Sequence, residues 1–263
     1  MGPGGGWVRA AHTALSGALT LGLLLHRTDL QKQEERGELL QPLAFVLLVL
    51  CSVLLYFSVS LMDPGFVKPE GAEAGEHEAQ SMTLPQVPSG IQDIPTRRCG
   101  YCLLKQPMRA RHCHLCQHCV RRYDHHCPWL ENCVGERNHP LFIVYLSVQL
   151  LVLLWGGQVA WSGLNFEQSW DWLKHNAVLL ISFLLIVTLS TVVLLLLVSH
   201  LYLISCNTTS WEFLSHHRIS YLRHSGLENP FDQGLVLNLW RFFCSCHLTT
   251  WEQIYLARRA QPV

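Results

Sequence analysis

Residues 99–138 read CGYCLLKQPMRARHCHLCQHCVRRYDHHCPWLENCVGERN and hold seven of the chain's eleven cysteines and five of its fifteen histidines. Several of these cysteines are separated by two intervening residues, a spacing by which one short turn presents two thiolates to a tetrahedral zinc ion. The pairs are Cys99/Cys102, Cys113/Cys116 and Cys116/Cys119. Two closed sites of three cysteines and one histidine each would use six of the seven cysteines, so the stretch predicts a zinc-stabilised domain with one thiol left over.

The run Asp124-His125-His126-Cys127 suggests a chemical role for the spare thiol. A cysteine with an ordinary pKa of about 8.5 is mostly protonated at neutral pH, and a neighbouring imidazole can take its proton. A carboxylate that orients this imidazole completes a Cys-His-Asp arrangement. The run therefore suggests a nucleophile beside its base, although adjacency in the sequence does not establish contact in space.

The spacing Cys-x2-Cys-x9-His-Cys-x2-Cys-x2-Cys-x4-Asp-His-His-Cys-x5-Cys resembles the DHHC family of protein S-acyltransferases. This resemblance implies two zinc sites, and matching residue by residue divides the ligands between them. The first site would be formed by Cys99, Cys102, His112 and Cys119, and the second by Cys113, Cys116, His126 and Cys133.

By the same resemblance, Cys127 would be the acylated nucleophile, His125 the general base and Asp124 its orienting partner. The implied activity is ping-pong transfer of palmitate from palmitoyl-CoA to cysteines of substrate proteins. On cysteine spacing alone, a RING-like or LIM-like binding module is an alternative. A zinc-stabilised membrane adaptor without catalytic activity is the alternative within the family resemblance.

The composition indicates a membrane protein, since 49% of the residues are hydrophobic and only 14% are charged. Four apolar stretches approach the roughly 20 residues that a helix needs to cross a bilayer. They cover residues 10–26, 42–62, 140–163 and 177–204. For the first stretch, a cleavable signal peptide is the competing interpretation. The predicted fold is an all-α polytopic membrane protein with four spans and a small loop-rich cytosolic domain that holds two zinc ions.

The distribution of Lys and Arg predicts which loops face the cytosol, because cytosolic loops carry an excess of both. The N-terminus, residues 63–139 and the tail from residue 205 carry fifteen, and the other two loops carry four. We therefore expect both termini and the zinc domain in the cytosol. The segments between the spans are a cytosolic N-terminus (1–9), a lumenal loop (27–41), a cytosolic linker (63–98), the zinc domain (99–138), a second lumenal loop (164–176) and a cytosolic tail (205–263).

Three further motifs match the family outside the cysteine-rich stretch. Asp63-Pro64-Gly65 follows the second span, and Thr209-Ser210-Trp211-Glu212 follows the fourth, with Ser in place of the family's second Thr. Asn238 belongs to a block in the tail that begins at Asn229. We expect these residues to have structural roles.

The expected partners are palmitoyl-CoA, membrane-proximal substrate proteins with a cysteine, and the lipid bilayer, with no nucleic acid. Arg121 and Arg122 are candidate contacts for the CoA phosphates, although basic residues beside a span also meet anionic lipid headgroups. Trp129, Phe142 and Tyr145 are candidate contacts for the acyl chain. The resemblance implies residence in the Golgi or the endoplasmic reticulum.

Overall fold

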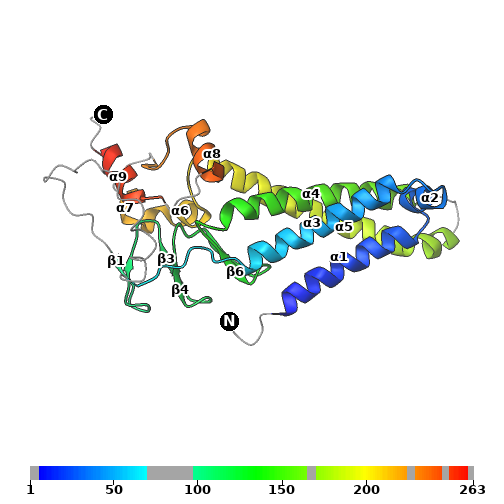
Figure 1. The fold of residues 1–263 in the computed structure, drawn as a ribbon, viewed down its shortest axis with the longest axis horizontal. Helices are drawn as coiled ribbons and strands as arrows, with labels where there is room; N and C mark the ends of the chain where they lie inside the picture. Colours follow the sequence, from blue (N-terminus) through cyan, green and yellow to red (C-terminus); the bar gives the residue numbers. More distant parts are fainter. Residues whose placement is uncertain (1–5, 70–96, 165–169, 224–228, 245–248, 260–263) are drawn as a thin grey trace. The chain divides into compact units, whose positions relative to one another are not determined.

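The computed structural model describes residues 6–69, 97–164, 170–223, 229–244 and 249–259 (Figure 1). The expected linker lies mostly outside these described residues. The chain divides into two compact units. We call Met1–Met62, Trp129–Glu131 and Leu141–His200 the helical unit, and Asp63–Pro128, Asn132–Pro140 and Leu201–Val263 the cysteine-rich unit.

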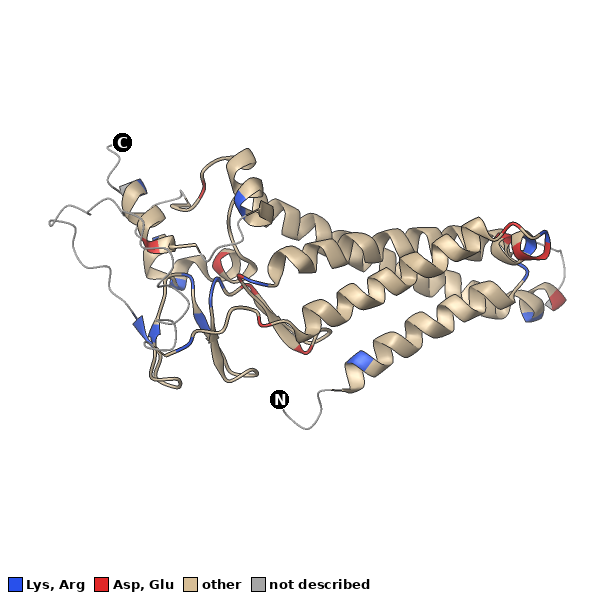
Figure 2. Cartoon of the chain, viewed as in Figure 1, with Lys and Arg blue, Asp and Glu red and all other residues tan. Residues whose placement is uncertain are grey.

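Four long helices have the length and composition of membrane spans. They are α1 (Trp7–Leu25), α3 (Leu40–Leu61), α4 (His139–Ser162) and α5 (Trp170–Ser205). Their mean hydropathies, each taken over an 18-residue window of the helix, are 1.3, 2.5, 1.9 and 2.9 in that order. Figure 2 shows these helices almost free of charged side chains. This confirms a mostly helical fold with four candidate membrane helices.

The four helices pack around small residues. A Cβ atom added to Gly156 of α4 would lie 3.6 Å from Leu23 of α1, 3.7 Å from Phe45 of α3 and 3.8 Å from Ile186 of α5. All three are ordinary van der Waals distances, so Gly156 lies where α1, α3 and α5 meet α4, and small residues are common at such points in membrane helix bundles. Leu23, Phe45 and Ile186 are all buried in the core of this unit.

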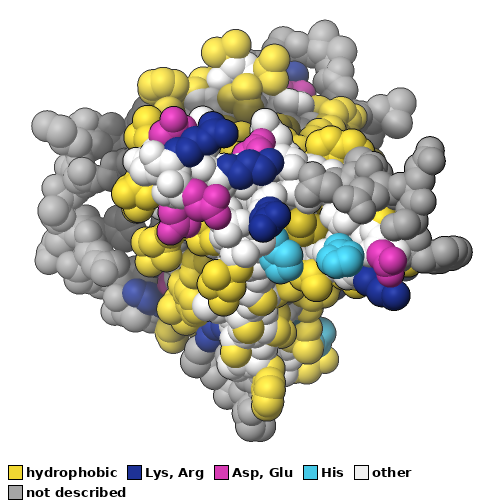
Figure 3. Space-filling view, turned by 90° about the vertical axis from the view of Figure 1, so that its right-hand side faces the viewer, with side chains coloured by type: hydrophobic (Ala, Val, Ile, Leu, Met, Phe, Trp, Pro, Cys, Tyr) yellow, Lys and Arg dark blue, Asp and Glu magenta, His cyan; other side chains and the backbone are white. Residues whose placement is uncertain are grey.

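The segments that join the long helices are more helical than the sequence predicts. The expected loop at 27–41 contains α2 (Asp29–Glu35), and α5 begins at Trp170, inside the expected loop at 164–176. Charged side chains gather at the end of the helical unit that carries α2, and hydrophobic side chains cover the surface beside them (Figure 3). This separation suits a bundle whose sides face lipid and whose end faces water.

The cysteine-rich unit contains three short antiparallel hairpins and several short helices. The strand pairs are β1 (Arg97–Arg98) with β2 (Lys105–Gln106), β3 (Arg111–Cys113) with β4 (His118–Val120), and β5 (His125–Cys127) with β6 (Asn132–Val134). The helices are α6 (Ser210–Ser215), the 3₁₀ helix η1 (His216–Arg218), α7 (Ser220–Arg223), α8 (Leu235–Cys244) and α9 (Trp251–Arg259). Strands this short have few ladder hydrogen bonds, so the hairpins need support from side chains or metal ions.

The segment after α3 folds onto the hairpins through the Asp63-Pro64-Gly65 motif. The Asp63 carboxylate accepts hydrogen bonds from the backbone N–H groups of Gly65 and Phe66, both at 2.8 Å, and pairs with Arg137 at 3.0 Å. Gly65 has a φ of 104°, which glycine adopts without strain. Its carbonyl accepts a hydrogen bond from Arg121 N–H. The motif therefore makes a tight turn that attaches this segment to the second hairpin.

Candidate active site and metal centres

The three hairpins repeat one design at intervals of fourteen residues. Cys99, Cys113 and Cys127 occupy the same position at the start of their turns. Four residues after each cysteine comes a residue in the left-handed region, and these are Leu103 (φ 55°), Gln117 (φ 56°) and Glu131 (φ 51°). The shared backbone conformation shows that the three turns are equivalent.

Two clusters of possible metal ligands arise from this repeat. Each cluster takes both cysteines of one turn and a histidine and a cysteine from the next hairpin, with all ligand atoms of a cluster within 4.8 Å of one another. The clusters are Cys99, Cys102, His112 and Cys119, and Cys113, Cys116, His126 and Cys133. The structure therefore brings together both expected ligand sets.

Strand alternation explains how neighbouring residues enter different clusters. Successive side chains of a strand point to opposite faces, so His112 and Cys113 of β3 face opposite ways. His112 lies opposite Cys119 in the β3–β4 ladder, and both belong to the first cluster. His126 lies opposite Cys133 in the β5–β6 ladder, and both belong to the second.

The ligand spacing fits tetrahedral zinc. Zn–S bonds of about 2.3 Å and Zn–N bonds of about 2.0–2.1 Å place neighbouring ligand atoms about 3.5–3.8 Å apart in a tetrahedron. In the second cluster, His126 Nδ1 lies 3.7, 3.3 and 3.6 Å from the sulfurs of Cys113, Cys116 and Cys133. The sulfurs of Cys116 and Cys133 are 3.4 Å apart, too far for a disulfide.

The third hairpin explains the spare thiol. Its turn begins with Cys127, but Leu130 stands where the other two turns have their second cysteine. In the described part of the chain no fourth hairpin follows to supply another histidine and cysteine. Cys127 is thus in the position of a metal ligand without the partners that would make a site. Strand alternation also places His125 and Cys127 on one face of β5 and His126 on the other.

Asp124, His125 and Cys127 form a connected acid–base set. His125 Nδ1 lies 2.7 Å from Asp124 Oδ2, and His125 also hydrogen-bonds with Cys127. Burial lowers the pKa of His125, but its bonds to Asp124 and Cys127 outweigh burial and raise the pKa to about 9. A more basic imidazole favours transfer of the thiol proton, and the set can therefore generate a nucleophilic thiolate.

The second oxygen of Asp124 is held by the start of α6. The backbone N–H of Ser210 donates to Asp124 Oδ1 at 2.8 Å. Thr209 and Glu212 close a capping box, because Glu212 N–H donates to Thr209 Oγ1 and Thr209 N–H donates to Glu212 Oε2. Since Ser210 holds Asp124 through its backbone, Ser in place of Thr preserves this bond.

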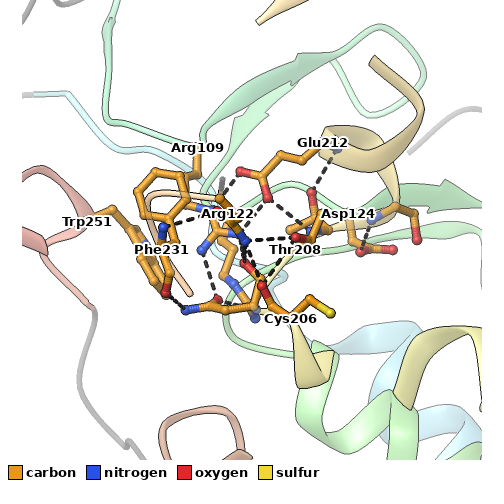
Figure 4. Close-up of polar contacts among 12 residues, drawn as sticks. Arg109, Arg122, Asp124, Cys206, Thr208, Glu212, Phe231 and Trp251 are labelled. Atoms are coloured by element: carbon orange, nitrogen blue, oxygen red, sulfur yellow. Dashed lines mark hydrogen bonds and ion pairs between the residues drawn. The ribbon is translucent and has the colours of Figure 1, made fainter. Parts of the chain in front are cut away.

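A buried ion pair between Arg109 and Glu212 supports the capping box, and the sequence did not predict this pairing. Arg109 Nε donates to Glu212 Oε1 at 2.7 Å, and a second bond joins Arg109 Nη2 to Glu212 Oε2 (Figure 4). The Arg109 side chain is fully buried and that of Glu212 is 3% exposed. Burial raises the pKa of Glu212, but Arg109 more than offsets this and holds the pKa below its ordinary value.

Aromatic side chains and Asn207 complete the surroundings of Arg109. The guanidinium carbon lies 4.3 Å from the ring centre of Phe231 and 4.4 Å from that of Trp251. Arg109 also donates to the backbone carbonyl of Asn207 at 2.8 Å and to its side-chain oxygen at 3.1 Å. Because Asn207, Phe231 and Trp251 come from three separate segments of the tail, Arg109 joins the segment between the first two hairpins to the tail.

The two arginines expected to contact CoA phosphates have internal partners in the structure. Arg122 is buried, donates to Asn207 Oδ1 at 3.2 Å and lies over the ring of Phe242. Arg121 pairs with Glu136 at 2.9 Å. Their position therefore favours structural roles over phosphate contacts.

A pocket of about 720 Å³ in the cysteine-rich unit presents other basic residues. Arg97, Arg98, Arg111 and Arg218 line it, together with the ring of Trp211. Arg97, Arg98 and Arg218 are exposed, and Arg111 stacks over Trp211 with its guanidinium carbon 3.1 Å from the ring centre. Arg111 Nη1 has no hydrogen-bond partner among the described residues. This pocket can receive an anion next to an aromatic surface.

The three candidate acyl contacts lie in the helical unit. Trp129 is 74% exposed, whereas Phe142 and Tyr145 of α4 are buried. Tyr145 hydroxyl bonds with His12 at 3.2 Å, and Tyr56 hydroxyl donates to the backbone carbonyl of Trp129 at 3.0 Å. The residues that follow the candidate nucleophile are thus held by α3. An acyl chain at these positions stays a prediction.

The fold and the site suit a class of membrane-embedded enzymes whose hairpin domain carries a thiol with an acid–base partner and two clusters that could hold metal ions. The family model for DHHC palmitoyltransferase matches residues 92–217, which include both metal clusters and the capping box. The chain belongs to the DHHC palmitoyltransferase family, as the sequence resemblance predicts.

Similar proteins occur in animals and plants. The chain is 56% identical to palmitoyltransferase ZDHHC12 of Homo sapiens over 94% of this chain and 91% of that protein. It is 52% identical to palmitoyltransferase ZDHHC12-A of Danio rerio over 95% of this chain and 93% of that protein. It is 31% identical to probable protein S-acyltransferase 2 of Arabidopsis thaliana over 76% and 52% of the two chains. The short linker, the short tail, the loop at residues 26–40 and the cysteine-rich run resemble the mammalian DHHC member numbered twelve, in agreement with the first of these relatives.

Proposed function

We propose that the chain transfers palmitate from palmitoyl-CoA to cysteines of substrate proteins through an acyl-enzyme on Cys127. The observation that carries this proposal is the contact of His125 with both Asp124 Oδ2 and Cys127. Family membership alone would also fit an inactive zinc-stabilised adaptor. An adaptor, however, has no need for a carboxylate-oriented imidazole beside the one cysteine of the hairpins that both metal clusters leave out.

In the first half-reaction, His125 accepts the proton of the Cys127 thiol, and the thiolate attacks the thioester carbonyl of palmitoyl-CoA. The bond between that carbonyl and the CoA sulfur breaks, and His125 returns the proton to the departing CoA thiolate. In the second half-reaction, His125 takes a proton from a substrate cysteine, whose sulfur attacks the thioester carbonyl on Cys127. The bond between that carbonyl and Cys127 Sγ breaks, and His125 returns the proton to the Cys127 thiolate. Asp124 fixes the orientation of the imidazole in both steps.

The two clusters would hold zinc ions, which would stabilise the hairpins by cross-linking strands too short to stand alone. His126 would then fix the strand that carries His125 and Cys127, because a ligand in the middle of β5 restrains both neighbours. The role we assign to this chain's ligands is therefore positional, and the chemistry belongs to Cys127 and His125.

For the CoA head group we favour the pocket lined by Arg97, Arg98, Arg111 and Arg218. Guanidinium groups bind phosphates strongly, and the partly buried ring of Trp211, which lines the pocket, offers an aromatic surface for an adenine ring. Arg121 and Arg122 would stabilise the cysteine-rich unit through their contacts with Glu136 and Asn207. Trp129, Phe142 and Tyr145 remain the candidate acyl contacts.

The topology we propose places both termini and the cysteine-rich unit in the cytosol, on the strength of the Lys and Arg distribution. Palmitoyl-CoA and reduced thiols are available on that side. Residence in the Golgi or endoplasmic reticulum is proposed from the family resemblance.

Labelling tests the acyl-enzyme directly. Purified wild-type and Cys127→Ser protein are incubated with an alkyne analogue of palmitoyl-CoA, and one half of each sample is washed with neutral hydroxylamine. We expect label on the wild type alone and its removal by hydroxylamine, which cleaves thioesters. Equal label on both proteins, or none on either, would favour the adaptor.

A further inference from the structure

The turn of the third hairpin is not held in the way that the first two turns are. In the first two turns, both cysteines enter a cluster of possible metal ligands, and an ion there would tie each turn to the next hairpin. In the third turn, Leu130 stands in place of the second cysteine. A single hairpin of such short strands is weak without further support. The turn that begins with Cys127 therefore depends on contacts of another kind.

Side chains of α3 supply two of these contacts. Trp129, Leu130 and Glu131 of the turn are part of the helical unit. The Tyr56 hydroxyl donates to the carbonyl of Trp129 at 3.0 Å, and the Ser60 hydroxyl donates to the carbonyl of Leu130 at 2.6 Å. Tyr56 and Ser60 are four residues apart and so lie on one face of α3. Both of these side chains are buried, as is Leu130.

Arg9 links this face of α3 to the last residue of the turn. It is the one charged residue of α1. Its Nε donates to Ser60 Oγ at 2.7 Å and lies 3.7 Å from Glu131 Oε2. The side chains of Arg9 and Glu131 are only 14% and 16% exposed, and burying a charge is costly unless it is paired or hydrogen-bonded. The pair therefore fixes Glu131 against α1 and α3.

A displacement of this turn would move the candidate nucleophile. Only Pro128 separates Cys127 from Trp129. The ring of a proline fixes its φ angle, so the chain has little freedom here to absorb a shift. A misplacement of about 1 Å can slow an enzymatic reaction by about 10²-fold. Contacts that hold Trp129 and the two residues after it are thus well placed to control the rate of acylation.

We propose that Arg9, Tyr56 and Ser60 are positioning residues for acyl transfer. They hold the third turn where the other two turns have metal ligands, and they thereby set the position of Cys127. Their action passes through the backbone of the turn, and they take no part in proton transfer. The inference rests on the proposed acyl-enzyme on Cys127 and adds to it the groups that keep the nucleophile in place.

Removing single hydroxyl groups tests this proposal with little change in packing. Full-length wild-type protein and the double variant Tyr56→Phe with Ser60→Ala are purified in detergent and mixed with an alkyne analogue of palmitoyl-CoA. Rapid-quench measurements give the rate constant of acyl-enzyme formation at saturation and the half-saturating concentration. The matched control is Ser58→Ala, which loses an exposed hydroxyl bonded to the carbonyl of Leu54 in α3 itself. Zinc content is measured for every protein.

We expect the double variant to form the acyl-enzyme about tenfold or more slowly than Ser58→Ala, with a half-saturating concentration within about twofold of the control. Its zinc content should be unchanged. Arg9→Gln should be slowed in the same way, and Arg9→Lys, which keeps the charge beside Glu131, should be slowed less.

Equal rate constants for the double variant and Ser58→Ala overturn the proposal. An unchanged rate constant with a raised half-saturating concentration also overturns it, because the hydroxyls would then act in substrate binding. Loss of zinc together with activity does the same, since it would show a role in folding. A wild type that forms no acyl-enzyme refutes the proposed function itself and this inference with it, so the two failures are distinguishable.

Discussion

Replacing Glu212 by Gln should lower the stability of the protein, because it removes the buried ion pair with Arg109. Gln keeps the size of Glu and an oxygen able to accept the capping hydrogen bond from Thr209 N–H. It leaves the Arg109 charge buried without its counter-ion, and removing one partner of a buried pair costs about 3–5 kcal/mol. Arg109 retains its contacts with Asn207, Phe231 and Trp251. We therefore expect the free energy of unfolding to fall by about 3 kcal/mol, near the lower end of that range.

Zinc release on heating provides the assay, because both metal clusters lie in the same unit as the ion pair. Protein in detergent is heated with a chromogenic chelator, and the midpoint of release is recorded. A loss of about 3 kcal/mol corresponds to a midpoint lower by roughly 10 °C for a domain of this size. The control is Asp171→Asn, which breaks a pair whose side chains are 70% and 78% exposed and should cost about 0.5 kcal/mol or less.

A double-mutant cycle then separates the pair from its surroundings. Arg109→Met alone should also destabilise, and Arg109→Met combined with Glu212→Gln should cost about 2 kcal/mol less than the two single losses together. Because the pKa of Glu212 is held below its ordinary value of about 4.3, its contribution is fully present above that pH and is lost as the pH falls below it. The destabilisation caused by Glu212→Gln should thus be equal at pH 6 and pH 8. A Glu212→Gln midpoint no lower than that of Asp171→Asn would refute this reasoning.

Four further predictions concern the site. Cys127→Ser should abolish acyl-enzyme formation and keep two zinc ions per chain by elemental analysis, whereas loss of a zinc would identify Cys127 as a ligand. His126→Ala should lose zinc and the folded state together; full zinc in a folded variant contradicts the second cluster. Asp124→Asn should keep both zinc ions and slow acylation by about 10²–10⁴-fold in a rapid-quench assay, since its task is to orient the imidazole. The double substitution Arg98→Gln with Arg218→Gln should raise the KM for palmitoyl-CoA by about tenfold or more with unchanged zinc content, from the loss of charged hydrogen bonds to phosphate, and an unchanged KM would place the head group elsewhere.

Much of the site is encoded in local spacing. The two-residue spacing of the cysteines and the run from Asp124 to Cys127 predict a metal-stabilised domain with a spare thiol, because a turn of this length can present its ligands in few ways. The fourteen-residue repeat of Cys99, Cys113 and Cys127 is also present in the sequence, but its meaning depends on the equivalent turns seen in the structure. Once the turns are aligned, Leu130 stands at the position of the second cysteine, which explains why Cys127 belongs to neither metal cluster.

Sequence by itself determined the four apolar stretches, since the thickness of a bilayer demands about 20 apolar residues wherever a helix crosses it. It also determined the ligand types and their spacing. Only the tertiary structure decided that Arg109 and Glu212 meet, that aromatic rings of the tail enclose them, and that Ser210 holds Asp124. Such contacts join residues about a hundred positions apart, and no local pattern of charge or hydrophobicity reveals which distant partner compensates a buried charge.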